Sequence, residues 1–261
     1  MNLESIKITK FQYIVLFLFL FLWLYVRAGP FEIIGFLQTH HLFNYEHEFL
    51  KRALVGEILR LSFKNLNAEI VYNLSLFFLI LLSIVFFKLF FINFNKDNNI
   101  KKLIFSTMVF VSPLTLQHFI FEIGRFEIIN ILITLLSFLI IEKFHKNTFL
   151  ILIFIFPLLN FMLLIHEGSF FMYIPMIFGF WFFKNSEKNT FGIQLVLFLI
   201  ITFITYKIST LGLSTKYTFT EYYNFLNDKY FIFAEDTDSN KFFSISSSAV
   251  EGLYRDLFNT Y

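Results

Sequence analysis

Ionisable residues that could support acid–base chemistry or bind a phosphate group occur in three short clusters. They are Glu46, Glu48 and Arg52, then His118, Glu122, Arg125 and Glu127, and finally His166 and Glu167. Carboxylates can act as general bases, imidazoles can transfer protons, and guanidinium groups bind phosphate through a planar fork of donors. The three clusters together therefore predict a site that could activate a hydroxyl group beside a phosphate group.

Each cluster also has a purely structural interpretation. Glu48 and Arg52 are four residues apart, a spacing at which two side chains on a helix form a surface ion pair. His118 and Glu122 have the same spacing, and the arginine that follows them could pair with either neighbouring glutamate. Glu46 could simply face water. The residue types alone leave both interpretations open.

The third cluster is fixed in depth by its apolar flanks. The stretch Thr148–Phe183 is interrupted only by His166-Glu167-Gly168-Ser169. A membrane-spanning helix needs roughly 20 apolar residues, so two short spans use the whole stretch. His166 and Glu167 are therefore predicted to lie at the tip of a helical hairpin, where they could be functional or could anchor the hairpin among the lipid headgroups.

The elements that position these clusters are predicted to be membrane-spanning helices. Hydrophobic residues make up 57% of the chain and charged residues only 15%, against roughly 25% in soluble domains. Mean hydropathy is +0.69. Seven apolar runs are candidate spans: Phe11–Val26, Ile70–Ile92, Leu103–Phe121, Ile128–Ile141, Thr148–Ile165, Phe170–Phe183 and Phe191–Tyr206. The fold class is therefore all-α, a polytopic transmembrane helix bundle of about seven spans forming a domain over residues 1–206.

The connections between these runs alternate in character. Every second connection is short and basic. The lysines of this set are Lys7 and Lys10; then Lys96, Lys101 and Lys102; then Lys143 and Lys146; and finally Lys184 and Lys188. Lysine-rich loops stay in the cytoplasm under the positive-inside rule. The N-terminus is therefore predicted inside, and all three polar clusters are predicted at the outer face.

The first outer loop, residues 27–69, is the longest polar connection between spans. Within it, Phe43–Lys64 is predicted to be helical, with leucine and isoleucine side chains on one face and a charged stripe of Glu57, Arg60 and Lys64. The remaining circumference is also apolar. This pattern favours a helix lying at the level of the lipid headgroups, although an ordinary connector helix would fit too.

Composition also excludes several classes of site. The chain has no cysteine, so thiolate metal sites and disulfides are excluded, and a net charge of +2 gives no indication of nucleic-acid binding. No cofactor motif or metal site is predicted. Residues 207–261 form an aromatic-rich outer segment, which could be a truncated loop; its run Glu235–Asp238 is interpreted as a solvated acidic turn.

The predicted membrane topology resembles that of bacterial surface-polysaccharide membrane proteins, namely type-C-fold glycosyltransferases and O-antigen or capsule polymerases. In the first family, the outer loop after the first span carries an acidic catalytic residue, here matched by Glu46 or Glu48 beside Lys51-Arg-Ala-Leu-Val-Gly56. In the second, outward-facing arginines hold lipid pyrophosphate, here matched by Arg125 and Arg52. The loop carries glutamate where the family often has aspartate, and the spans are fewer than in either family.

The resemblance implies an enzyme of the bacterial cytoplasmic membrane that acts at its outer face. Its substrate would be a polyprenyl-linked sugar, with a loop glutamate as the base and Arg125 and Arg52 at the pyrophosphate. His166 and Glu167 would position sugar hydroxyls or relay protons, and other polysaccharide-assembly proteins could be partners. The alternatives are a transporter or flippase of lipid-linked oligosaccharide, or a noncatalytic membrane assembly partner.

Overall fold

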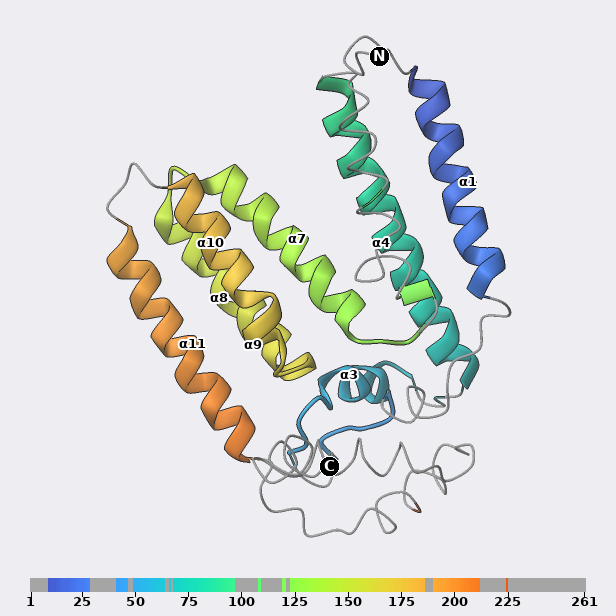
Figure 1. Ribbon diagram of the computed structural model, residues 1–261. Helices are drawn as coiled ribbons and strands as arrows, with labels where there is room; N and C mark the ends of the chain where they lie inside the picture. Colours follow the sequence, from blue (N-terminus) through green and yellow to red (C-terminus); the bar gives the residue numbers. More distant parts are fainter. Residues whose placement is uncertain are drawn as a thin grey trace, which may run out of the picture. The chain divides into compact units, whose positions relative to one another are not determined.

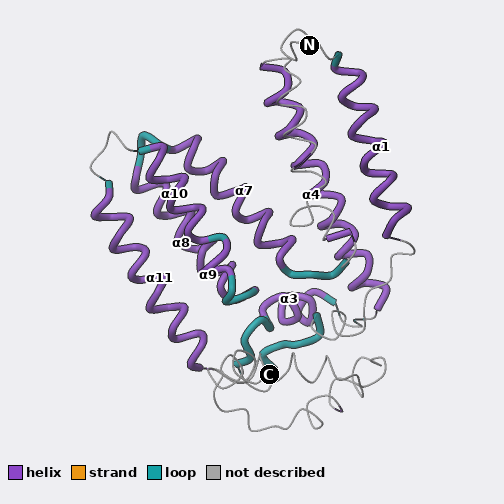
Figure 2. The backbone as a smooth tube through the Cα atoms, viewed as in Figure 1, coloured by secondary structure: helices purple, strands orange, loops and turns teal. Residues whose placement is uncertain are grey.

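The computed structural model describes residues 9–28, 41–46, 49–63, 66, 68–96, 108, 119–120, 123–185, 190–211 and 224. In this part of the chain every regular element is a helix (Figure 2). The chain divides into two compact units, residues 1–34 with 69–128, and residues 35–68 with 129–261. The predicted all-α class is confirmed for the described residues.

The first unit contains two long apolar helices, α1 (Lys10–Ala28) and α4 (Ala68–Lys96) (Figure 1). The two helices contact each other through the aromatic rings of Phe17 and Phe87, whose centroids are 4.6 Å apart. The start of α1 is set locally by a reciprocal capping arrangement. The Thr9 N–H donates to Gln12 Oε1 at 2.9 Å, and the Gln12 N–H donates to Thr9 Oγ1 at 3.3 Å, so donors that the helix leaves unpaired are satisfied.

The second unit is a helix bundle with a short helix at one end. Its elements are α3 (Leu54–Ser62), most of α7 (Glu127–Phe144), α8 (Thr148–Ile165), α9 (Ser169–Met172), α10 (Ile174–Lys184) and α11 (Phe191–Leu211). Helices α8 and α10 both pack against α11, and α3 packs against α8. The core along α8 is made of its buried side chains Ile151, Ile155, Leu159 and Met162.

Helix α7 runs in the same direction as α9 and α10, as three contacts show. Asn130 of α7 meets Ser169 at the start of α9, Phe138 meets Phe180 with ring centroids 4.6 Å apart, and Glu142 meets Lys184 at 3.2 Å. The partners advance in the same direction along both helices. Because α8 connects them in the opposite direction, the His166 turn and the His145 turn lie at opposite ends of α8, about 27 Å apart.

Among the described residues, three helical segments are long and apolar enough to cross a membrane, and they indicate a membrane protein. They are Glu69–Lys88, Thr148–Ile165 and Phe191–Thr210, and Ser169–Lys184 is a shorter apolar segment. Helix α8 coincides with the predicted run 148–165. The predicted run 103–121 lies outside the described residues except at positions 108, 119 and 120. The count of seven spans and their orientation remain predictions.

Two local predictions are wrong. The helix predicted over Phe43–Lys64 begins only at Leu54, because the segment before it must pass across α3 instead of extending it. Because the apolar run 128–141 is short, residues 124–127 are also predicted to complete the top turn of that helix, but Arg125 precedes α7, which starts at Glu127. Gly124 has a φ of 103°, a left-handed backbone conformation that breaks a helical path before that point.

Glycine at position 56 allows the close approach of α3 to the preceding segment. A Cβ atom at this position would collide with the Phe43 carbonyl oxygen and lie 2.7 Å from the His41 carbonyl oxygen. Both obstacles are backbone atoms, which cannot rotate away. The buried face of α3, made by Val55, Gly56 and Leu59, therefore rests on the chain at residues 41–43.

Substitution Gly56→Ala is expected to destabilise the protein by about 1–3 kcal/mol, the usual cost of overpacking a filled interior. The matched control is Gly179→Ala, since a Cβ at Gly179 meets nothing within 4 Å and alanine is the better helix former. The measurement is the midpoint of thermal unfolding of each purified variant in detergent. Equal midpoints for the two variants would contradict the close approach.

Candidate functional site

A bidentate ion pair joins the segment before α3 to the turn between α8 and α9. Arg52 Nε donates to Glu167 Oε2 at 2.9 Å, and Arg52 Nη2 donates to Glu167 Oε1 at 2.7 Å. The two side chains are only 12% and 13% exposed, and their positions are 115 residues apart in the chain. We refer to this pair and the turns that carry it as the Arg52–Glu167 junction.

Arg52 is held in an unusual backbone conformation. Its φ is +64°, in the left-handed region, which costs a side-chain-bearing residue roughly 1–2 kcal/mol. The tight turn around it is closed by the Ala53 N–H, which donates to the Leu50 carbonyl at 3.4 Å. The two charge-assisted hydrogen bonds to Glu167 offset this strain, because bidentate pairs are the strongest of their kind.

On the other side of the junction, the turn after α8 is shaped by its own backbone. The His166 N–H closes α8 on Met162 at 2.9 Å, and the Gly168 N–H donates to His166 Nδ1 at 3.0 Å. A Cβ at Gly168 would lie 2.7 Å from the His166 ring, so glycine lets the imidazole lie over the turn. Because Nδ1 is an acceptor here, neutral His166 carries its proton on Nε2.

The junction is electrostatically polarised. Burial raises the pKa of Glu167, but hydrogen bonds and charge from Arg52, with a smaller effect of His166, outweigh burial and lower this pKa to about 2. Lys51 beside it is only 3% exposed. Burial lowers the pKa of Lys51, with Glu167 acting in the opposite sense and Arg52 in the same sense. Glu167 is therefore a permanent anion and a weak base.

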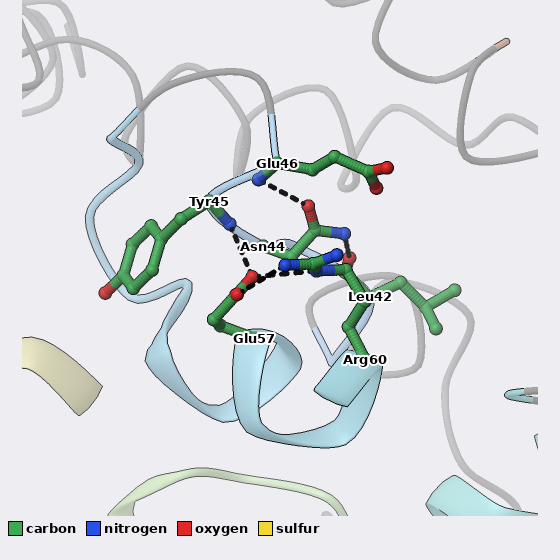
Figure 3. Close-up of polar contacts among 6 residues, drawn as sticks. All are labelled: Leu42, Asn44, Tyr45, Glu46, Glu57 and Arg60. Carbon is green, nitrogen blue, oxygen red and sulfur yellow. Dashed lines mark hydrogen bonds and ion pairs between the residues drawn. The ribbon is translucent and has the colours of Figure 1, made fainter. Parts of the chain in front are cut away.

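A second polar group fixes the loop against α3 (Figure 3). Glu57 accepts from Arg60 Nη2 at 2.6 Å and from Arg60 Nε at 3.0 Å, and it also accepts the Tyr45 N–H at 3.1 Å. Burial, followed by the charge of Glu57, raises the pKa of the Tyr45 phenol to about 12. Glu57 is therefore engaged in holding the loop against α3.

Glu46 is an exposed acidic residue in the described part of this loop. Its backbone N–H donates to Asn44 Oδ1 at 3.0 Å, while Asn44 Nδ2 donates to the Leu42 carbonyl at 3.0 Å. Asn44 is buried, so the backbone that carries Glu46 is held from inside the loop. Figure 3 shows the Glu46 side chain extending away from the Glu57–Arg60 pair. A general base needs this combination of a fixed backbone and an accessible carboxylate.

The remaining predicted site residues fall elsewhere. Arg125 and Glu127 belong to the first unit, where Arg125 Nη1 lies 3.4 Å from Glu127 Oε1. Glu48, His118 and Glu122 lie outside the described residues. The structure thus brings together Arg52 and Glu167, which came from two different predicted clusters, with His166 in the same turn.

Sequence reasoning missed three residues near the junction. Lys51 was noted only as part of a basic dipeptide, and nothing in sequence marks a lysine as buried. Asn130 and Ser169 are also buried, at 0% and 1% exposure. The sequence did contain a signal for Asn130, because placing a polar side chain inside an apolar span costs free energy and usually marks a functional residue. Among the described residues no group of three or more acidic or histidine side chains could hold a metal ion.

Fold and site together define a helical membrane protein with a charged junction at one end of a helix bundle. No protein-family model, curated protein or solved structure matches the chain. Its function is therefore argued from the site alone.

Proposed function

We propose that the chain is a bacterial cytoplasmic-membrane enzyme that transfers or polymerises sugars carried on a polyprenyl phosphate or pyrophosphate, at the outer face of the membrane. The observation that carries this proposal is the Arg52–Glu167 junction. It ties a loop bearing an exposed carboxylate, a buried lysine and a largely buried arginine to the turn between two apolar helices. A substrate with a lipid tail, an anionic phosphate and a sugar hydroxyl needs those three surroundings together.

Each residue of the junction has a proposed task. Glu46 removes the proton from the acceptor hydroxyl, because it is exposed whereas Glu167 is a weak base. Arg52 uses Nε and Nη2 for Glu167, which leaves Nη1 to bind a phosphate oxygen and stabilise the departing group. Lys51 adds positive charge beside Arg52. His166 Nε2 positions a sugar hydroxyl or relays a proton.

Arg125, in the first unit, is a separate candidate for binding phosphate. It lies outside a helix, and its guanidinium pairs with Glu127 through Nη1. At 3.4 Å and with both side chains partly exposed, this contact is weaker than the Arg52–Glu167 pair. The pyrophosphate site is therefore proposed to rest on Arg52, and Arg125 remains a separate candidate.

The direct test uses the purified full chain in liposomes with a radiolabelled lipid-linked sugar and an unlabelled lipid-linked acceptor. The proposal expects a product with a new glycosidic bond, formed only when the protein is present. Movement of the labelled lipid across the bilayer without a new bond would identify a flippase instead. Neither product nor movement with any of several lipid-linked sugars would favour the noncatalytic assembly partner.

The proposal also fixes which end of α8 faces outward. Ser62 at the end of α3 and Lys146 before α8 are both exposed, and the chain has no native cysteine. In intact cells an impermeant thiol reagent is expected to label Ser62→Cys and to leave Lys146→Cys unlabelled, because lysine-rich turns stay inside. Permeabilised cells provide the control, in which both variants should react. The reverse pattern in intact cells would place the junction in the cytoplasm and remove the proposal.

A further inference from the structure

Helix α8 carries a polar side chain on the side that does not pack into the second unit. Its buried side chains, among them Ile155 and Leu159, form the core, whereas Asn160 is partly exposed. Asn160 lies five residues before the end of α8 at Ile165, about 8 Å along the helix axis, and thus at hydrocarbon depth in a span of this length. A polar group at that depth is costly unless it finds a partner.

The amide of Asn160 is only partly used within its own helix. Its Nδ2 donates to the Phe156 carbonyl at 2.7 Å, and among the described residues no hydrogen bond reaches Oδ1. The opposite assignment of the amide would set two oxygens against each other, so Oδ1 is the atom left for a partner. Pro157 has no N–H to donate to the Ile153 carbonyl, which adds a second acceptor on this side. Since hydrocarbon contains no water, a neighbouring helix must supply the donors.

Asn160 belongs to an exposed stripe that runs along α8. The spacings within the stripe are four, three, four and four residues, which keep its side chains on one side of a helix. Its members are Phe149, Ile153, Phe156, Asn160 and Leu164, all exposed or partly exposed. A single polar residue in an apolar stripe fixes the register of a helix pair, because any shift would leave the amide against apolar side chains.

We propose that α8 pairs with α8 of a second copy of this chain, and that the two Asn160 amides hydrogen-bond to each other across the interface. Copies inserted in one membrane share an orientation, so a two-fold axis along the membrane normal brings each residue of the stripe opposite its own copy. An amide is self-complementary, because its oxygen accepts from the nitrogen of an identical amide. The proposal does not depend on the proposed function. It requires only that α8 crosses a membrane, for which the helix is long and apolar enough.

Single cysteines test the stripe directly, since the chain has no native cysteine. Membrane vesicles containing Ile153→Cys or Phe156→Cys are treated with a copper oxidant and analysed for disulfide-linked dimers. We expect dimers from both variants, because equivalent residues of the stripe meet across the axis at a distance that a disulfide can bridge. Phe203→Cys is the matched control. Phe203 is an exposed aromatic residue of α11, outside the stripe, and its variant should stay monomeric.

The contribution of the amide is measured by energy transfer between full chains in liposomes, labelled at Ser62→Cys, as the ratio of protein to lipid is varied. Asn160→Leu is expected to weaken association about tenfold, as expected for the loss of interhelical hydrogen bonds in lipid. Asn160→Gln keeps the amide and should retain most of the association. Thr202→Val is the matched control. Thr202 is exposed on α11 and its hydroxyl donates within that helix to the Phe198 carbonyl at 2.8 Å, so association should not change.

Several outcomes would overturn the inference. They are a chain that stays monomeric at every protein-to-lipid ratio, a dimer that crosslinks through Phe203→Cys but through neither stripe position, and an association that Asn160→Leu leaves unchanged. Crosslinks from the stripe to a different membrane protein, with none between copies, would assign the stripe to that partner instead. The cysteine variants keep Asn160, so they test the surface even if Asn160→Leu folds poorly. Absence of sugar transfer by an intact dimer would count against the proposed function alone.

Discussion

Replacing Glu167 with glutamine is expected to destabilise the protein by about 3–5 kcal/mol, because it leaves the largely buried guanidinium of Arg52 without its counter-charge. Both hydrogen bonds of the pair are charge-assisted, so the neutral amide cannot replace them. The loop carrying Arg52 should detach from the α8–α9 turn as a result. Thermal unfolding of the purified variant in detergent, followed by helical circular dichroism, measures the change.

Glu142→Gln is the matched control for this prediction. It breaks the ion pair with Lys184 at 3.2 Å, in which the carboxylate side chain is 62% exposed, and exposed pairs contribute only about 0–1 kcal/mol. A loss of stability in Glu167→Gln no larger than in Glu142→Gln would contradict a buried junction. The double variant Arg52→Met with Glu167→Leu should recover much of the stability, because apolar residues of similar size replace both charges. It should remain inactive if Arg52 holds phosphate.

The same pair predicts a pH dependence with a definite sign. The pKa of Glu167 is lowered from 4.5 to about 2 in the folded protein. The folded state therefore binds the proton less tightly than the unfolded state, so the pair stabilises fully above about pH 4.5 and loses its contribution as the pH falls toward about 2. The difference in unfolding midpoint between wild type and Glu167→Gln should be greatest at neutral pH. It should shrink below about pH 4.5, and a constant difference would contradict the lowered pKa.

Substituting Glu46 with glutamine is expected to reduce sugar transfer by roughly 10²–10⁴-fold, the usual contribution of a general base. Glutamine keeps the size of the side chain but cannot accept a proton. The fold should be unaffected, since the hydrogen bond that positions this residue comes from its backbone N–H to Asn44. The measurement is the rate of transfer in liposomes with equal amounts of folded protein.

Glu48→Gln and the double variant complete this test, because Glu48 is the other candidate in the same loop. Glu142→Gln serves again as control, as an exposed carboxylate before the opposite turn of α8. If only Glu48→Gln is inactive, the base is Glu48. Wild-type rates in Glu46→Gln, Glu48→Gln and the double variant would remove glutamate catalysis from the proposal, although the phosphate site could stand.

The sequence predicted helix ends well where the signals were local. Helix α8 runs from Thr148 to Ile165 as expected, with Asn147 accepting the Leu150 N–H at 3.2 Å as its cap. The hairpin tip at His166 and Glu167 was also correctly predicted, since 36 apolar and turn residues leave little choice of path. The extended helix over residues 43–64 was wrong because amphipathic spacing does not show that a glycine must pack on backbone.

What the sequence determined by itself is the course of the apolar helices among the described residues and the position of polar clusters between them. These depend on neighbouring residues, as at Thr9 and Gln12, and on the cost of polar groups in lipid. What only the tertiary structure decided is which clusters meet. The spacing left open whether Arg52 pairs with Glu48 one helical turn away or serves a site, but the left-handed turn at Arg52 and the docking of α3 turn it toward Glu167. Pairing over such a separation arises from packing of whole elements, which no local pattern encodes.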